Sequence, residues 1–174
     1  MIRVLDIVPE TTVDGPGFRT SIYCAGCSHQ CPGCHNPQSW DFSAGREMSV
    51  EELAQVVLAD EFADVTFSGG DPMYQAGEFA RLAQLIKERS SKTIWCYTGF
   101  RFEELTAPEQ QELLRHIDVL VDGPFVAAQR DTSLRFRGSS NQRLIDVQAS
   151  LRRGAVVQLD ENTEVRQRRT RLRR

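Results

Sequence analysis

The stretch DVTFSGGDPMYQAGEFARLAQLIKERSSKTIWCYTG, residues 64–99, decides the fold class. It opens with a short apolar and β-branched run, Asp64–Ser68, and closes with a second run, Thr93–Tyr97. Between them, Ala76–Arg89 repeats its apolar residues at helical spacing, so one helix face is apolar. A strand, an amphipathic helix and a strand in succession predict a parallel β–α–β unit.

The same alternation extends on both sides of this unit. A helix is expected over Ser49–Asp60, because Ser49 and Glu52 have the spacing of a capping box. The other expected elements are a helix over Arg101–His116 interrupted near Pro108, a helical turn at Ala149–Arg153, and strands Phe18–Cys24, Asp118–Val121, Leu144–Val147 and Ala155–Leu159. A complete eight-unit barrel needs roughly 200–250 residues. With 174 residues, the chain is therefore predicted to be an α/β protein with a partial, open βα barrel of mostly parallel strands.

Four of the expected strands run into glycine, at Gly26, Gly69–Gly70, Gly99 and Gly123. Glycine lets a ligand approach the main chain closely. In parallel α/β folds, ligands bind at the carboxyl ends of the strands. These glycines are therefore expected on one rim, together with the cysteines that follow the first strand.

Composition and charge narrow the class of protein. Hydrophobic residues make up 40% of the chain, enough for a folded core, and there is no long apolar run that would span a membrane. The N-terminus lacks the pattern of a signal peptide, so a cytoplasmic location is expected. We expect one domain over residues 1–163 and a basic, disordered tail over 164–174, and the six arginines within 166–174 do not by themselves indicate nucleic-acid binding.

Four of the five cysteines lie close together, with the spacing Cys24-x2-Cys27-x3-Cys31-x2-Cys34. Clustered thiols in a reducing compartment indicate a metal or a metal cluster. One interpretation is a structural zinc site built from all four thiolates, in a non-enzymatic adaptor. Another is a ferredoxin-like electron carrier, although its usual spacing differs. A third uses only Cys27, Cys31 and Cys34 on a four-iron cluster, leaving one iron open for chemistry.

Six motifs occur in order along the chain. They are VDGPGFR at 13–19, GCSHQCPGCHNP at 26–37 and SGGDP at 68–72, followed by WCYTGF at 95–100, VLVDGPF at 119–125 and RGSSNQ at 137–142. Together they resemble the radical S-adenosylmethionine family, over roughly residues 5–160. Many members have an aromatic residue just before the last cysteine. This chain has Gly33 at that position, and in this it resembles the subgroup that activates ribonucleotide reductase.

The resemblance implies the same partial, open βα barrel, two cofactors and a reaction. The cofactors are a [4Fe-4S] cluster on Cys27, Cys31 and Cys34, and S-adenosylmethionine, which is cleaved to a 5′-deoxyadenosyl radical. The implied protein substrate is the glycyl-radical subunit of anaerobic ribonucleotide reductase, and another glycyl radical enzyme is the near alternative. A low-potential donor such as flavodoxin or ferredoxin would supply the electron, and neither a membrane nor a nucleic acid is an expected partner.

The resemblance also implies which residues contact S-adenosylmethionine. The methionyl amino group would lie in the loop of Ser68, Gly69, Gly70 and Asp71, the adenine against Gly33, Cys34 and His35, and Asp122 on the same rim. Read from the residues alone, Asp71 favours a turn-shaping role, since it follows two glycines and precedes a proline. His29 lies inside the cysteine loop and is expected beside the site rather than as a ligand.

Overall fold

The predicted parallel unit forms the centre of a single open sheet. The computed structural model describes residues 1–160. Its strands are β1 (Ile2–Thr11), β2 (Arg19–Cys24), β3 (Arg46–Met48), β4 (Asp64–Gly69), β5 (Ile94–Tyr97), β6 (Val119–Asp122) and β7 (Arg143–Asp146). They lie in the order β3-β1-β2-β4-β5-β6-β7. Neighbours from β2 to β6 are parallel, whereas β3, β1 and β7 join antiparallel.

The expectation of a partial barrel of mostly parallel strands is therefore confirmed only in part. The fold is mixed α/β, the middle of the sheet is parallel and the sheet does not close, but half of its neighbouring pairs are antiparallel. The antiparallel pairs lie at the two ends. There the chain reaches its next strand by a turn or a loop instead of a crossover helix.

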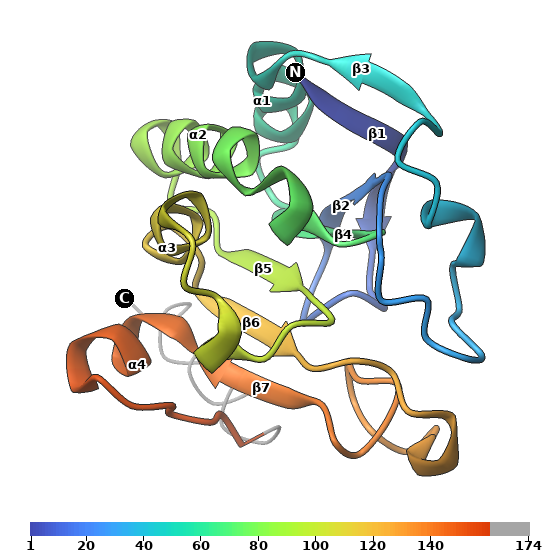
Figure 1. Ribbon diagram of the computed structural model, residues 1–174. Helices are drawn as coiled ribbons and strands as arrows, with labels where there is room; N and C mark the ends of the chain where they lie inside the picture. The colour runs from blue at the N-terminus through green and yellow to red at the C-terminus, as the bar shows by residue number, and fades with distance from the viewer. Residues whose placement is uncertain (161–174) are drawn as a thin grey trace.

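The helices cover one face of the sheet, as Figure 1 shows for α1 to α3. They are α1 (Val50–Ala59), α2 (Ala76–Arg89), α3 (Pro108–Leu114) and α4 (Val147–Arg153), with 3-10 turns η1 (Pro37–Ser39), η2 (Pro72–Gln75), η3 (Phe102–Glu104) and η4 (Ala127–Gln129). The predicted bounds of α2 are confirmed, and so is the capping box of Ser49 and Glu52. No helix in the described part of the chain is long and apolar enough to cross a membrane.

Two sequence predictions are wrong in detail. The helix expected over Arg101–His116 is only the short turn η3 and the helix α3, which starts at Pro108. Proline favours the first turn of a helix, where its missing N–H costs nothing, so it starts this helix instead of interrupting it. The strand expected over Ala155–Leu159 is a single bridge between Ile145 and Gln158.

Alternate residues of each central strand face opposite sides of the sheet. Ile22, Phe67 and Cys96 belong to the core under the helices, whereas Trp95 and Val121 belong to a smaller cluster on the other face. That second face also buries the side chain of Arg19 completely. Its guanidinium donates to Thr66 Oγ1 at 2.7 Å and to the carbonyl of Val65 at 2.5 Å, and lies 5.4 Å from the ring of Trp95.

The arrows of β4, β5 and β6 point toward the segment that carries the cysteines (Figure 1). The carboxyl ends of the parallel strands and the loop after β2 therefore meet at one rim. Gly69, Gly70, Gly99 and Gly123 all line the cavity at this rim, as the glycine pattern predicts. Gly26 lies directly behind Gly70, whose added Cβ would come 2.5 Å from the Gly26 carbonyl oxygen.

Candidate metal centre

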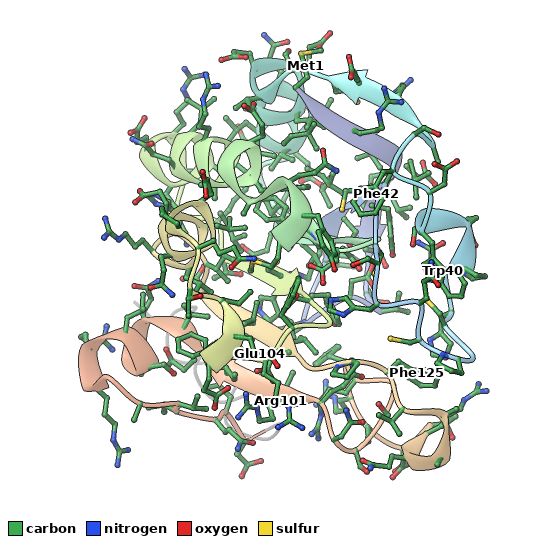
Figure 2. The ribbon with its side chains drawn as sticks, viewed as in Figure 1. Met1, Trp40, Phe42, Arg101, Glu104 and Phe125 are labelled. Atoms are coloured by element: carbon green, nitrogen blue, oxygen red, sulfur yellow. The ribbon has the colours of Figure 1, made fainter. Side chains whose placement is uncertain are left out.

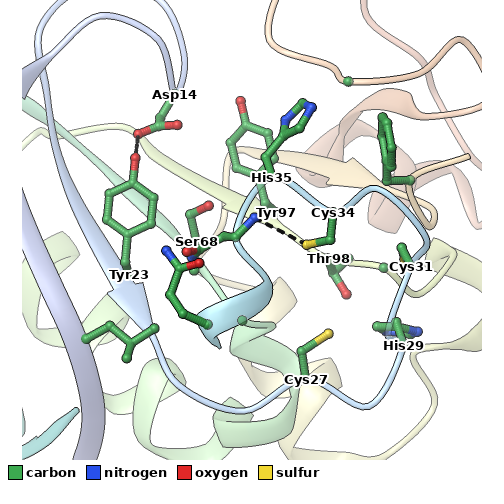
Figure 3. A pocket seen from close by; sticks show the side chains of 18 of the residues that line it. Asp14, Tyr23, Cys27, His29, Cys31, Cys34, His35, Ser68, Tyr97 and Thr98 are labelled. Atoms are coloured by element: carbon green, nitrogen blue, oxygen red, sulfur yellow. Dashed lines mark hydrogen bonds between the residues drawn. The ribbon is translucent and has the colours of Figure 1, made fainter. Parts of the chain in front are cut away.

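Three cysteines line a cavity of about 750 Å3 at this rim. Cys27, Cys31 and Cys34 lie on one loop after β2, and Figure 3 shows the sulfurs of Cys27 and Cys34 directed into the space that the loop surrounds. All three thiols are free and partly exposed. The loop therefore presents three soft ligands to one opening.

Main-chain hydrogen bonds join the start of this loop to the residues that follow it. Gly26 N donates to the carbonyl of Ser39 at 2.8 Å and Cys27 N to that of Trp40 at 3.2 Å. Within the loop, Asn36 N donates to the sulfur of Cys34 at 3.4 Å. Hydrogen bonds to a cluster sulfur tune its potential, so Asn36 is a site residue that the sequence interpretation did not include.

Cys24 and Cys96 are not part of this group. Both are completely buried in the core under the helices, and burial raises the pKa of each thiol. A four-thiolate zinc site would require Cys24 to face the other three cysteines. Within residues 1–160, no three His, Cys, Asp or Glu side chains converge on a single ion. An iron–sulfur cluster does not require that convergence, because each thiolate binds a different iron.

The loop Ser68–Gly70 forms the wall of the cavity beside the cysteines. Gly69 has φ +102°, and a Cβ there would lie 2.3 Å from Cys24 N, so only glycine fits next to β2. Gly70 N donates to the carbonyl of Cys24 at 2.7 Å. Backbone instead of side chain therefore faces the cavity at this point.

Asp71, the next residue, does not line the cavity. Its side chain is completely buried behind the wall and accepts hydrogen bonds from Met73 N at 2.9 Å, Thr98 Oγ1 at 2.8 Å and Gly99 N at 2.9 Å. The turn-shaping role is the one that these contacts support.

The residues predicted to contact adenine lie around the last cysteine of the loop. Cys34 and His35 line the cavity, while Gly33 does not, although it belongs to the same turn. The ring of His35 lies 5.1 Å from that of Phe125, and a Cβ on Gly33 would lie 3.4 Å from the Phe125 ring. Figure 2 shows Phe125 on the segment after β6, facing the cysteine loop. Phe125 thus forms an apolar wall that the sequence interpretation did not assign to the site.

Asp122 lies at the end of β6 but does not face the cavity. Its side chain is 1% exposed and pairs with Arg143 at 2.9 Å and 2.5 Å. It also accepts from Phe102 N at 2.7 Å. Arg143 reaches the exposed Glu103 as well, at 2.7 Å. The geometry of Asp122 is that of a buried ion pair behind the rim.

Two tyrosines, Tyr23 and Tyr97, and Asp14 also line the cavity. Tyr23 donates a hydrogen bond to the carboxylate of Asp14 (Figure 3). Burial is the main cause that raises the pKa of Tyr23, and this hydrogen bond raises it further. The sequence carries a signal for this wall, since Arg19, Ser21 and Tyr23 alternate along β2 and share its second face.

The residues present fit an iron–sulfur cluster with a bound small molecule. Cysteine thiolates are the ligands that such clusters take from proteins, and this short loop carries three of them. A cavity of about 750 Å3 lies within the range of roughly 300–1,000 Å3 that small-molecule sites occupy. Burial raises the pKa of Cys27, but a coordinating thiol loses its proton outright.

Comparison with known proteins agrees with this geometry. A family model described as "4Fe-4S single cluster domain" matches residues 13–145. The anaerobic ribonucleoside-triphosphate reductase-activating protein of Vibrio cholerae is 41% identical over 143 residues, which cover 77% of this chain and 91% of that protein. Proteins of the same name from Haemophilus influenzae and Enterobacteria phage T4 are each 36% identical, over 81% and 79% of this chain and 96% and 90% of their own lengths.

The open α/β sheet, the three-thiol loop and the family match define a single-cluster iron–sulfur protein. Within that class, the chain belongs to the family of anaerobic ribonucleoside-triphosphate reductase-activating proteins.

Proposed function

We propose that this chain is a radical S-adenosylmethionine activase that generates a glycyl radical on anaerobic ribonucleotide reductase. One observation carries the proposal: the three free thiols and the backbone loop Ser68–Gly70 line the same cavity. The names of the relatives support the choice of target.

The chemistry belongs to the bound groups. When bound, a [4Fe-4S] cluster would supply the one electron needed to cleave the C–S bond of S-adenosylmethionine, giving methionine and a 5′-deoxyadenosyl radical that would take a hydrogen atom from the target glycine and leave 5′-deoxyadenosine and a glycyl radical.

The chain's own residues bind and orient these groups. Cys27, Cys31 and Cys34 would hold three irons, leaving the fourth without a protein ligand. The backbone of Ser68–Gly70 would receive the amino acid part of S-adenosylmethionine, which requires the close approach that glycine permits. His35 and Phe125, whose rings lie 5.1 Å apart, offer flat surfaces to the adenine and restrict water. Asp71 and Asp122 act from behind the rim, through the segments that their hydrogen bonds hold.

The proposed partners are the glycyl-radical subunit of the reductase and a low-potential donor such as flavodoxin or ferredoxin. The proposed location is the cytoplasm. The proposed division of the chain, with a basic tail at 164–174, falls on residues outside those that the structure describes.

Electron paramagnetic resonance tests the target directly. Anoxically reconstituted, reduced protein is mixed with S-adenosylmethionine and the reductase subunit, and in parallel with other glycyl radical enzymes. A glycyl radical signal only with the reductase is the expected result. A signal only with another enzyme would move the chain to that target, and no signal with any enzyme, despite a loaded cluster, would contradict activase function.

A further inference from the structure

His29 lines the same cavity and stands between two of the cysteines, but the site as described so far gives it no role. Figure 3 shows it on the cysteine loop, between Cys27 and Cys31. Its Nε2 lies 3.0 Å from Oδ2 of Asp71, and its side chain is 19% exposed. The cysteine loop therefore reaches, through one side chain, the residue that follows the Ser68–Gly70 wall.

The fold makes room for this contact. A Cβ on Gly99 would lie 2.4 Å from the His29 ring, so the ring occupies space that only a glycine leaves free. On its other sides the ring packs edge-on against Phe100, at 4.5 Å, and lies 5.9 Å from Tyr74. The imidazole is held in one orientation by packing, with one nitrogen directed at the buried carboxylate.

Asp71 joins three segments at one point. Asp71 belongs to the Ser68–Pro72 loop. Its carboxylate accepts hydrogen bonds from Thr98 Oγ1 and Gly99 N, which follow β5, and from His29 on the cysteine loop. Its own N–H donates to the carbonyl of Gly26 at 2.9 Å. A completely buried carboxylate with these bonds has little freedom to move.

A second contact joins the same two loops. The hydroxyl of Ser28, next to His29, is hydrogen-bonded to the hydroxyl of Tyr74, which lies in the turn η2 directly after Asp71. Two adjacent residues of the cysteine loop thus reach two residues of the segment that follows the glycine wall.

We propose that His29 is a positioning residue that joins the cluster loop to the S-adenosylmethionine loop through Asp71. This inference rests on the proposed function, because it concerns how two bound groups are held relative to each other. Cys27, Cys31 and Cys34 bind the cluster, while the backbone before Asp71 forms the proposed wall for the amino acid part of the second ligand. The His29–Asp71 contact helps to fix the distance between them, together with the bond from Asp71 N to the Gly26 carbonyl and the Ser28–Tyr74 bond.

Positioning of this kind has a known cost when it is lost. Removing a hydrogen-bonding partner behind a metal site weakens metal affinity or activity by about ten- to hundredfold, and we expect a loss of the same order in the affinity for S-adenosylmethionine. Loss of the contact is expected to leave the three thiolates in place, so cluster assembly is kept. The affinity for S-adenosylmethionine falls, because the open iron and the backbone wall are no longer held together.

Two variants separate the hydrogen bond from the ring. His29→Phe keeps an aromatic ring in the space beside Gly99 and Phe100 but cannot donate to Asp71. His29→Gln keeps a donor at about the reach of Nε2 and loses the ring. His116→Phe is the matched control, because His116 also pairs with a carboxylate, Glu112 at 3.3 Å, but lies just after α3 and does not line the cavity. His29→Asn, which is polar but too short to reach Asp71, replaces the Phe variant if that variant does not fold.

Each protein is reconstituted under anoxia and measured for iron content, for S-adenosylmethionine dissociation constant and for the change that S-adenosylmethionine causes in the paramagnetic resonance spectrum of the reduced cluster. In His29→Phe we expect wild-type iron content, a dissociation constant raised about ten- to hundredfold and a reduced spectral change. In His29→Gln most of the affinity returns, and His116→Phe equals the wild type.

Three results would overturn the inference. The first is an affinity of His29→Phe for S-adenosylmethionine equal to that of the wild type. The second is an affinity that falls only in proportion to lost iron, which would make His29 a residue for folding of the loop. The third is an affinity of His29→Gln as weak as that of His29→Phe. In each case the wild type still binds S-adenosylmethionine, so the proposed function stands. A loaded wild type that shows neither binding nor a spectral change instead refutes the proposed function, and the inference with it.

Discussion

Replacing Asp122 by alanine tests whether this residue holds the fold or the cofactor. The sequence predicts a cofactor contact, whereas the structure shows a carboxylate with 1% of its side chain exposed, bonded to Arg143 and to Phe102 N. Asp122→Ala removes the carboxylate that accepts hydrogen bonds from both Arg143 and Phe102 N. The buried N–H of Phe102 loses its acceptor, and Arg143 keeps only Glu103.

The size of the effect follows from burial. Breaking a completely buried ion pair costs about 3–5 kcal/mol, because a charge is left without a partner. Arg143 is 24% exposed and still contacts Glu103, so the cost is lower, about 2–3 kcal/mol. For a domain of this size that corresponds to a fall of roughly 4–12 °C in melting temperature.

Glu103→Gln is the matched control, since Glu103 binds the same arginine but is 56% exposed. An exposed partner contributes less than about 1 kcal/mol. Thermal unfolding of the reconstituted proteins by circular dichroism compares the two variants, and S-adenosylmethionine binding is measured alongside. Equal shifts for both variants would refute the reasoning from burial. An unchanged melting temperature with weakened binding in Asp122→Ala would make Asp122 a cofactor contact.

Three further predictions concern the cysteines, a glycine and the effect of pH. Cys24→Ala is expected to keep the wild-type iron content and Cys34→Ser to lose iron, because Cys34 lines the cavity with Cys27 and Cys31 whereas Cys24 is buried in the core; iron analysis after anoxic reconstitution decides, and loss of iron in Cys24→Ala would restore the four-thiolate interpretation. Gly69→Ala is expected to destabilise the fold by about 3 kcal/mol, since its Cβ would meet Cys24 N at 2.3 Å, whereas Gly154→Ala, with φ +68° and no atom within 4 Å, costs only about 1 kcal/mol; equal unfolding free energies would contradict the clash. Hydrogen bonds from Arg143 lower the pKa of Glu103 from 4.5 to about 2, so its contribution to stability is present above pH 4.5 and is lost as the pH falls toward 2. The stability difference between the wild type and Glu103→Gln should therefore narrow over that range, and a constant difference would count against the ion pair.

Local patterns were sufficient for the centre of the fold. The helix Ala76–Arg89 and the capping box of Ser49 and Glu52 follow from short-range spacing, and the structure has both. The strand β1 (Ile2–Thr11) was not predicted. Its alternation is weak because both faces are partly covered, and its pairing with β2 contains register shifts. Its other pairing, with β3, joins Ile2 to Met48, which are far apart in the sequence, and a local pattern does not report such a contact.

The candidate site divides in the same way. The cysteine spacing and the strand-end glycines lead to the rim, because parallel strands bring their carboxyl ends to one edge. The spacing does not show which way a side chain turns. Asp71 and Asp122 follow strands as expected, yet both carboxylates turn away from the cavity to hydrogen-bond neighbouring segments. Phe125 reaches the site from a loop whose course is set by long-range packing.

In the proposed function, Cys27, Cys31 and Cys34 hold a cluster that cleaves S-adenosylmethionine. The most direct measurement is product formation by the reduced, reconstituted protein alone, with S-adenosylmethionine under anoxia. We predict 5′-deoxyadenosine and methionine in equal amounts, retained in Cys24→Ala and abolished in Cys34→Ser. A cluster-loaded, reduced wild-type protein that forms neither product would contradict the account.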